Sequence, residues 1–236
     1  GLICAVGSLD IEPGDEIITT PWTMCATATS ILHWNAIPVF ADIDPNTFCI
    51  SAESIKEKIS PRTKAVLAVD IFGQSANYEE IRAVIPSHVK IIADTAQSPG
   101  ALRNGKYAGT LADIGGFSFN YHKHIHTGEG GVILTNDNVL AERCRLIRNH
   151  AEAIMEDRPE APLNNMIGYN FRMGELEAAI AIQQLKKLKN ITTKRTKSAS
   201  LLTKLLERID LLKTPYVDST NTHVYYMYAL ILDKSI

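Results

Sequence analysis

The segment FSFNYHKHIHTGEGG, residues 117–131, decides how the chain folds, because it joins two apolar runs at a turn. Ile114 to Phe119 leads into the segment, and the β-branched run Val132 to Thr135 leads out of it, so both flanks are expected to be strands. Lys123 then lies just beyond the end of a buried strand. The glycines that follow it would let the backbone approach a ligand closely.

Lys123 is therefore a candidate nucleophile. In an α/β sheet the carboxyl ends of the strands face the ligand crevice. A lysine held there can lose its proton and attack a carbonyl group, forming a Schiff base. The alternative for this residue is an exposed lysine on a turn.

Apolar runs and amphipathic segments alternate along most of the chain, which predicts a three-layer α/β/α fold with a mostly parallel sheet. Strands are expected at residues 16–20, 38–41, 65–69, 89–93, 114–119 and 132–135, and helices at 23–34, after Ser51, at 78–84 and at 138–148. Asp94 directly follows the fourth of these strands. Topology therefore predicts that Asp94 and Lys123 meet over one crevice.

The last third of the chain is expected to begin a smaller C-terminal α+β domain. Helices are predicted at 175–188 and 194–209, with a domain boundary between them, so that 1–190 form a large domain and 191–236 start a second one. Residues 156–162 are expected to form an exposed loop, and Val224 to Leu232 a strand without a partner. Both ends of the chain look cut, as in an internal piece of a longer protein.

Composition narrows the class of protein. The 236 residues are 45% hydrophobic and 21% charged with a net charge of -2, which gives no reason to expect nucleic acid or an anionic membrane as a partner. No apolar run is long enough to span a bilayer, and no secretory signal begins the chain. The four cysteines are scattered without a CxxC pair, which favours the reducing cytoplasm.

Three histidines alternate around the lysine, at positions 122, 124 and 126. On an extended segment they would share one side, a spacing that a metal could use. The reading that we favour is polar lining of a substrate crevice, with no metal.

Seven motifs, taken in order, resemble the sugar-nucleotide aminotransferases of the DegT/DnrJ/EryC/StrS type, and the resemblance covers nearly the whole chain. The motifs are PGDE (13–16), VFADID (39–44), FGQ (72–74), DTAQ (94–97), FSF (117–119), GEGG (128–131) and GYNFRM (168–173). The resemblance implies the aspartate aminotransferase fold and pyridoxal 5'-phosphate as cofactor. It also implies that Lys123 forms the Schiff base and then moves a proton between substrate and cofactor, while Asp94 keeps the ring nitrogen protonated.

The resemblance assigns further cofactor contacts. Gln97 matches a residue near the phenolic oxygen of the ring, with a surface amide as the alternative. Ser118 matches a serine that reaches the phosphate, with a serine bonded to its own backbone as the alternative. Asn170 matches an asparagine that reaches the phosphate of the neighbouring subunit, which implies a homodimer with shared sites.

The chain departs from the family pattern at two places. The family usually stacks an aromatic residue on the ring where this chain has Met24, and a shift of the alignment would put Trp22 there instead. The Gly-Thr phosphate turn of the family would lie before Gly1, so this piece alone is expected to bind the cofactor poorly.

The function that we expect is transfer of an amino group from glutamate to a keto sugar linked to a nucleotide diphosphate. One alternative is a sugar dehydratase on the same fold, but those relatives lack the Schiff-base lysine. A second alternative is a non-catalytic regulator or sensor that reuses the fold, and a third is a metal-dependent hydrolase built on the three histidines.

Overall fold

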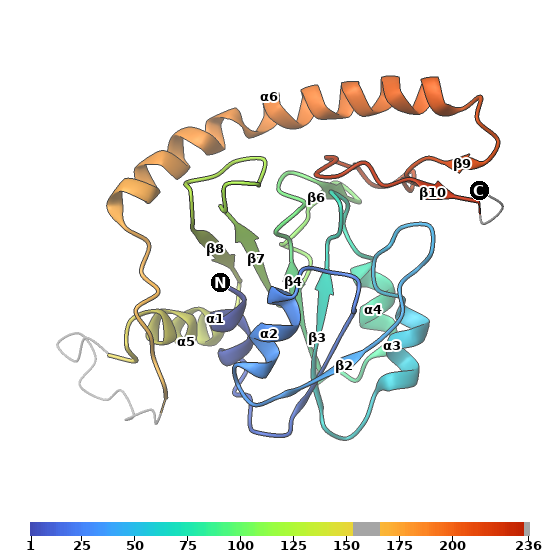
Figure 1. Cartoon of the computed structure of the whole chain (residues 1–236). Helices are drawn as coiled ribbons and strands as arrows, with labels where there is room; N and C mark the ends of the chain where they lie inside the picture. The colour runs from blue at the N-terminus through green and yellow to red at the C-terminus, as the bar shows by residue number, and fades with distance from the viewer. Residues whose placement is uncertain (153–165, 234–236) are drawn as a thin grey trace.

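The centre of the computed structural model, which describes residues 1–152 and 166–233, is a six-stranded sheet (Figure 1). Its order is β2-β1-β3-β4-β7-β8. The strands are β1 (Glu16–Thr19), β2 (Ile37–Phe40), β3 (Thr63–Val69), β4 (Lys90–Asp94), β7 (Ile114–Ser118) and β8 (Gly131–Leu134). Every neighbouring pair is parallel except β7 and β8. The mostly parallel sheet expected from the sequence is confirmed.

Helices cover both faces of the sheet and complete the three layers. They are α1 (Leu2–Gly7), α2 (Ala26–Leu32), α3 (Ala52–Lys58), α4 (Tyr78–Val84) and α5 (Asn138–Arg148). α1 contacts α2 and α5, whereas α3 contacts α4. Right-handed crossovers place these two groups on opposite faces, because the chain reverses its direction across the sheet after β2.

Local sequence explains why these elements begin where they do. The side chain of Ser51 accepts a hydrogen bond from the Ser54 amide, so it caps α3 as expected. In β3 the residues Ala65, Val66, Leu67 and Ala68 are all fully buried, which is typical of a strand covered on both faces. A short hairpin that the sequence did not predict, β5 (Leu102–Arg103) with β6 (Lys106–Tyr107), follows β4.

The prediction of two helices after residue 174 is wrong, because α6 runs without a break from Glu175 to Leu206 (Figure 1). The β-branched residues at 191–193 do not interrupt it. The hydroxyl of Thr192 bonds back to the Leu188 carbonyl and is satisfied within the helix. A division of the chain into domains at residue 190 stays a prediction, and the helix crosses that point.

The strand predicted from Val224 to Leu232 is also wrong over most of its length. Only β10 (Ile231–Leu232) is a strand, and it pairs antiparallel with β9 (Leu212–Lys213). Residues 208–233 lie between α6 and the carboxyl ends of the central strands (Figure 1). The loop expected at 156–162 lies outside the described residues.

Across residues 1–152 and 166–233, no helix combines the length and hydropathy that crossing a bilayer requires.

Two adjacent glycines of β7 offer a matched test of how closely the sheet packs. A Cβ at Gly115 would lie 2.0 Å from the Gly109 carbonyl oxygen, whereas a Cβ at Gly116 would meet nothing closer than 3.7 Å. We expect Gly115→Ala to lower the free energy of unfolding by about 2 kcal/mol or more, because the backbone of residue 109 must move. Urea denaturation measures this change. Gly116→Ala is the control and should leave stability within about 0.5 kcal/mol; equal effects would contradict the packing described here.

Candidate active site

The structure brings Asp94 and Lys123 to the same end of the sheet. Asp94 is the last residue of β4, and it pairs in register with Gly116 of the neighbouring strand β7, whose continuation carries Lys123. Asp94 is 6% exposed and Lys123 is half-buried. The two charges interact, since Asp94 raises the pKa of Lys123 and Lys123 lowers that of Asp94. The two residues therefore lie at one end of the sheet, as expected, while a ligand crevice between them stays a prediction.

The Asp94 carboxylate is held by neutral donors. Thr27 Oγ1 donates a 2.9 Å hydrogen bond to Oδ2, and the Ala96 amide donates a 3.2 Å bond to Oδ1. Burial raises the pKa of Asp94, and these donors oppose the rise. In the described part of the chain, no basic side chain lies within 4.0 Å of Asp94. A buried carboxylate without a close cation can receive a protonated nitrogen from a ligand.

Thr27 is a site residue that sequence analysis missed. It lies on α2 and is fully buried, and its hydroxyl also lies 2.9 Å from the hydroxyl of Thr23. Buried threonines on a helix that packs against a sheet are common, so no signal in the sequence singled this one out.

The environment of Lys123 lowers its pKa through burial, an effect that Asp94 partly offsets. Its Nζ lies 4.7 Å from the ring centroid of Tyr226, a residue more than 100 positions away in the chain. Sequence analysis missed Tyr226, because only the tertiary fold carries residues 223–228 to this end of the sheet.

Gln97 and Ser118 lie near these residues and already make hydrogen bonds within the protein. Gln97 Oε1 accepts a 2.7 Å bond from the Phe72 amide, so it is not a free surface amide. Ser118 Oγ accepts a 3.2 Å bond from the Asn120 amide, as in the backbone-bonded alternative, although the same hydroxyl can still donate to a ligand.

The remaining predicted residues are more exposed. Met24 is 65% exposed and Trp22 is 50% exposed. The Trp22 ring packs against Phe48 and Phe72, with centroids 6.2 and 6.5 Å apart. Asn170 is exposed and forms a backbone bridge with Asn149. In the part of the chain that the structure describes, it makes no hydrogen bond to Asp94 or Lys123. The structure therefore does not bring Asn170 to the other predicted residues of the same chain.

The three histidines do not lie on an extended segment, so the condition under which they would share one side is not met. Polar lining of a substrate crevice, the interpretation that we favour, stays a prediction. Residues 121–125 form turns and bends rather than a strand. His122 and His126 are exposed, whereas His124 is buried and its Nε2 lies 3.0 Å from the Val224 carbonyl oxygen. No cluster of three or more His, Cys, Asp or Glu residues suited to a metal ion occurs among residues 1–152 and 166–233.

A second buried acid, Asp70, supports the site from the end of β3. Its carboxylate accepts hydrogen bonds from the Ala76 amide (2.8 Å), the Tyr78 hydroxyl (2.9 Å) and Thr95 Oγ1 (2.6 Å). Burial raises the pKa of Asp70 to about 7. Because Thr95 directly follows Asp94, this network fixes the backbone that carries Asp94. Its position after an apolar run is the same signal that identified Asp94.

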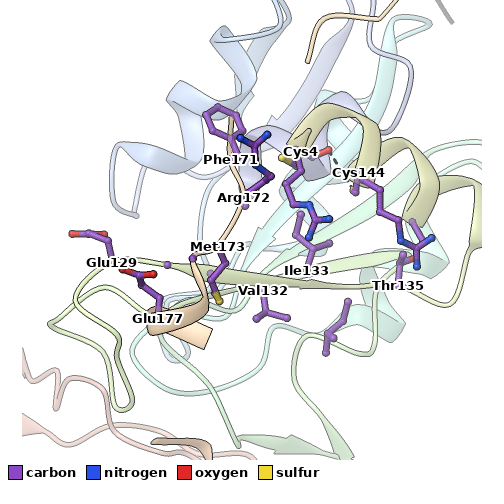
Figure 2. A pocket seen from close by; sticks show the side chains of 18 residues that line it. Cys4, Glu129, Val132, Ile133, Thr135, Cys144, Phe171, Arg172, Met173 and Glu177 are labelled. Carbon is purple, nitrogen blue, oxygen red and sulfur yellow. Dashed lines mark hydrogen bonds between the residues drawn. The ribbon is translucent and has the colours of Figure 1, made fainter. Parts of the chain in front are cut away.

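A pocket of about 920 Å³ lies elsewhere, beside the outer strand β8 (Figure 2). Its lining comes from three parts of the chain: the strand β8 (Val132 and Ile133), the helices α1 and α5 (Cys4 and Cys144) and the segment Phe171–Met173. None of the predicted site residues lines this pocket, so we do not assign it to the chemistry of Lys123.

Comparisons with known proteins agree with the sequence motifs. The sequence model of the DegT/DnrJ/EryC1/StrS aminotransferase family matches residues 1–236. A protein named pleiotropic regulatory protein from Geobacillus stearothermophilus is 39% identical over 234 residues, covering 98% of this chain and 61% of the relative. GDP-perosamine synthase from Caulobacter vibrioides is 35% identical over 234 residues, covering 98% of this chain and 62% of the relative.

Solved structures share the fold. A GDP-4-keto-6-deoxymannose-3-dehydratase with a trapped PLP-glutamate geminal diamine has a TM-score of 0.88 and 30% identity, covering 100% of this chain and 66% of that one. This chain thus spans less than two thirds of the length of each of these relatives.

Substitution of Thr27 tests the environment of Asp94. The folded-state pKa of Asp94 lies above its unfolded value, so stability falls as the pH rises from the unfolded to the folded pKa. Thr27→Val removes a donor to the ionised form and raises the folded pKa further. We therefore expect the variant to lose more stability at pH 8 than at pH 5, by about 1–2 kcal/mol.

Urea denaturation at both pH values measures this difference. Thr29→Val is the matched control, because the Thr29 hydroxyl bonds only within the exposed face of α2, to the Ala26 carbonyl. A loss in Thr27→Val that is the same at pH 5 and pH 8 would show that the hydroxyl does not act on the charge of Asp94.

Proposed function

The chain belongs to the DegT/DnrJ/EryC1/StrS aminotransferase family, and we propose that the protein is a pyridoxal phosphate-dependent transaminase. It would move an amino group from glutamate to a keto sugar attached to a nucleotide diphosphate. The observation that carries the proposal is the half-buried Lys123, whose charge interacts with the buried Asp94 across the carboxyl ends of β4 and β7.

The chemistry of the donor set fits this cofactor. Pyridoxal phosphate, when bound, supplies an electron sink as long as its ring nitrogen stays protonated. The Asp94 carboxylate is buried, accepts bonds from neutral donors and has no cation within 4.0 Å in the described part of the chain, so it is suited to hold that proton.

Lys123 would hold the cofactor and move the proton. Burial lowers its pKa, and this increases the fraction of neutral amine that can attack a carbonyl carbon. Once displaced by the amino group of a substrate, the same neutral amine can accept a proton from the substrate carbon and return it to another atom.

Four other residues would complete the cofactor site, and their roles are proposals. Ser118 would donate its hydroxyl to the phosphate, and Gln97 would face the phenolic oxygen of the ring. Met24 would cover one face of the ring through its polarisable sulfur. Asn170, which is exposed, would reach the phosphate in a second copy of the chain. The protein would therefore act as a homodimer with shared sites, in the reducing cytoplasm.

The sugar substrate is supported by the names of relatives. The 35% identical relative from Caulobacter vibrioides is a GDP-perosamine synthase. A nucleotide-linked keto sugar is the matching acceptor class for this chain. Glutamate as donor is supported by the dehydratase structure that holds PLP and glutamate.

A second candidate function is non-catalytic regulation. The observation that favours it is the name of the 39% identical relative, pleiotropic regulatory protein. A regulator of this kind would still hold the cofactor on Lys123 but would transfer no amino group. A sugar dehydratase is a weaker alternative, because the family resemblance implies that enzymes with that activity lack the Schiff-base lysine that Lys123 would supply here.

The first test asks whether Lys123 binds the cofactor. We expect borohydride treatment of the purified protein with pyridoxal phosphate to leave a stable covalent label on Lys123, located by peptide mass spectrometry. Lys123→Arg is expected to abolish this label, because a guanidinium does not condense with an aldehyde at neutral pH. Label on other lysines alone, unchanged in Lys123→Arg, would contradict the proposal.

The second test asks which reaction follows. Incubation with glutamate and a panel of nucleotide-linked keto sugars is expected to yield 2-oxoglutarate and an amino sugar, read by mass spectrometry. Asp94→Asn should keep the label on Lys123 but lower the rate by about a hundredfold or more, because an amide does not hold the ring proton. A label on Lys123 without transfer to any sugar would favour the regulator, and loss of water from the sugar without amination would favour the dehydratase.

A further inference from the structure

Residues 223–228, with the sequence HVYYMY, form a strap that lies between α6 and the carboxyl ends of the central strands (Figure 1). One side of the strap is bonded to the turn after β3. The Val224 amide donates to the Gly73 carbonyl (2.7 Å), and the Met227 amide donates to the Phe72 carbonyl (3.1 Å). A Cβ at Gly73 would lie 2.5 Å from the Tyr225 nitrogen, so only glycine allows this approach.

The other side of the strap is bonded to α6. Arg195 donates from Nε to the Tyr225 carbonyl (3.0 Å) and from Nη2 to the Tyr226 carbonyl (3.1 Å). The hydroxyls of Thr203 and Tyr228 lie 2.7 Å apart. Because both sides are bonded, the backbone that carries the Tyr226 ring is held in place by segments distant in the sequence.

The strap places that ring over the amine. Lys123 Nζ lies 4.7 Å from the Tyr226 ring centroid, within the range in which a ring face attracts a cation. The other groups that act on Lys123 are Asp94, which favours the ammonium, and burial, which opposes it. His124 is also near, and burial lowers its pKa, which favours its neutral form.

We propose that Tyr226 is a positioning residue for Lys123: its ring holds the ammonium in the field of Asp94 and so controls when the amine is free to react. The inference rests on the proposed function, since the reaction meant is that of Lys123 with the cofactor aldehyde. In that reaction Nζ would bond to the aldehyde carbon, and the aldehyde oxygen would leave as water with the two protons of the neutral amine. Only the neutral amine can begin this reaction, so a group that stabilises the ammonium shifts the pH at which Lys123 becomes reactive.

Competitive acetylation with acetic anhydride, read lysine by lysine by mass spectrometry, measures the protonation of Lys123 without any cofactor. We expect Tyr226→Leu to move the labelling midpoint of Lys123 downward by about half a unit to one and a half units, because the attraction of the ring for the ammonium is lost. The pH profile of borohydride-trapped pyridoxal phosphate on Lys123 should move by the same amount.

Two variants separate the ring from its surroundings. Tyr226→Phe keeps the aromatic face and should leave the midpoint unchanged. Tyr121 lies two residues before Lys123, and its exposed ring is tilted by 35° against the His122 ring, with the centroids 3.8 Å apart. Tyr121→Leu removes this ring and should also leave the midpoint unchanged. Near-ultraviolet circular dichroism and the melting temperature check that each variant is folded.

Two results would overturn the inference: a folded Tyr226→Leu variant with the wild-type midpoint, or a Tyr226→Phe variant that shifts as far as Tyr226→Leu. If Tyr226→Leu does not fold, Tyr226→Met replaces it, because methionine keeps the bulk of the side chain without a ring. A wild-type midpoint in a folded Tyr226→Met variant, or a Tyr226→Phe variant that shifts as far as Tyr226→Met, would then overturn the inference. Failure of the proposed function is separate, since it appears as absence of the pyridoxal phosphate label on Lys123 while the acetylation midpoint still depends on the ring.

Discussion

The interaction on which the rest depends is the one between a buried carboxylate, Asp94, and a half-buried amine, Lys123. Neither group is stable in an apolar environment without compensation, because burial penalises the charged form of each. Parallel pairing of β4 with β7 supplies that compensation, since it brings both strand ends to one edge of the sheet. Hydroxyl and amide donors from Thr27 and Ala96 then hold the carboxylate in place.

Around this pair the protein builds its rigidity from segments that are distant in sequence. Asp70 ties the end of β3 to Thr95 through a 2.6 Å hydrogen bond, so the backbone beside Asp94 cannot shift independently. The strap of residues 223–228 is bonded to Gly73 below and to Arg195 above. A site assembled in this way is pre-organised, because its side chains are attached to backbone that these hydrogen bonds hold in one position at the sheet edge.

Much of the fold was predictable because local and global preferences agree. The helices α4 and α5 begin and end at the residues that their sequence pattern indicates, and all six central strands were predicted within one or two residues of their observed bounds. The prediction of secondary structure failed where contacts with the rest of the molecule override the local sequence pattern. The β-branched residues at 191–193 continue α6 because a threonine hydroxyl bonds within the helix. The segment from 224 to 230 is not a strand, and the amides of Val224 and Met227 bond instead to the turn at Gly73 and Phe72.

The sequence by itself determined the family, the parallel sheet and the two residues at its strand ends, because each of these follows from short motifs and from hydrophobic runs that are read along the chain. Only the tertiary structure decided what surrounds those residues. Thr27, Asp70 and Tyr226 reach the site from α2, β3 and the C-terminal strap, and His124 turns inward while His122 and His126 stay exposed. The physical reason is that burial and hydrogen-bond partners depend on distances in space, which separations along the chain do not encode.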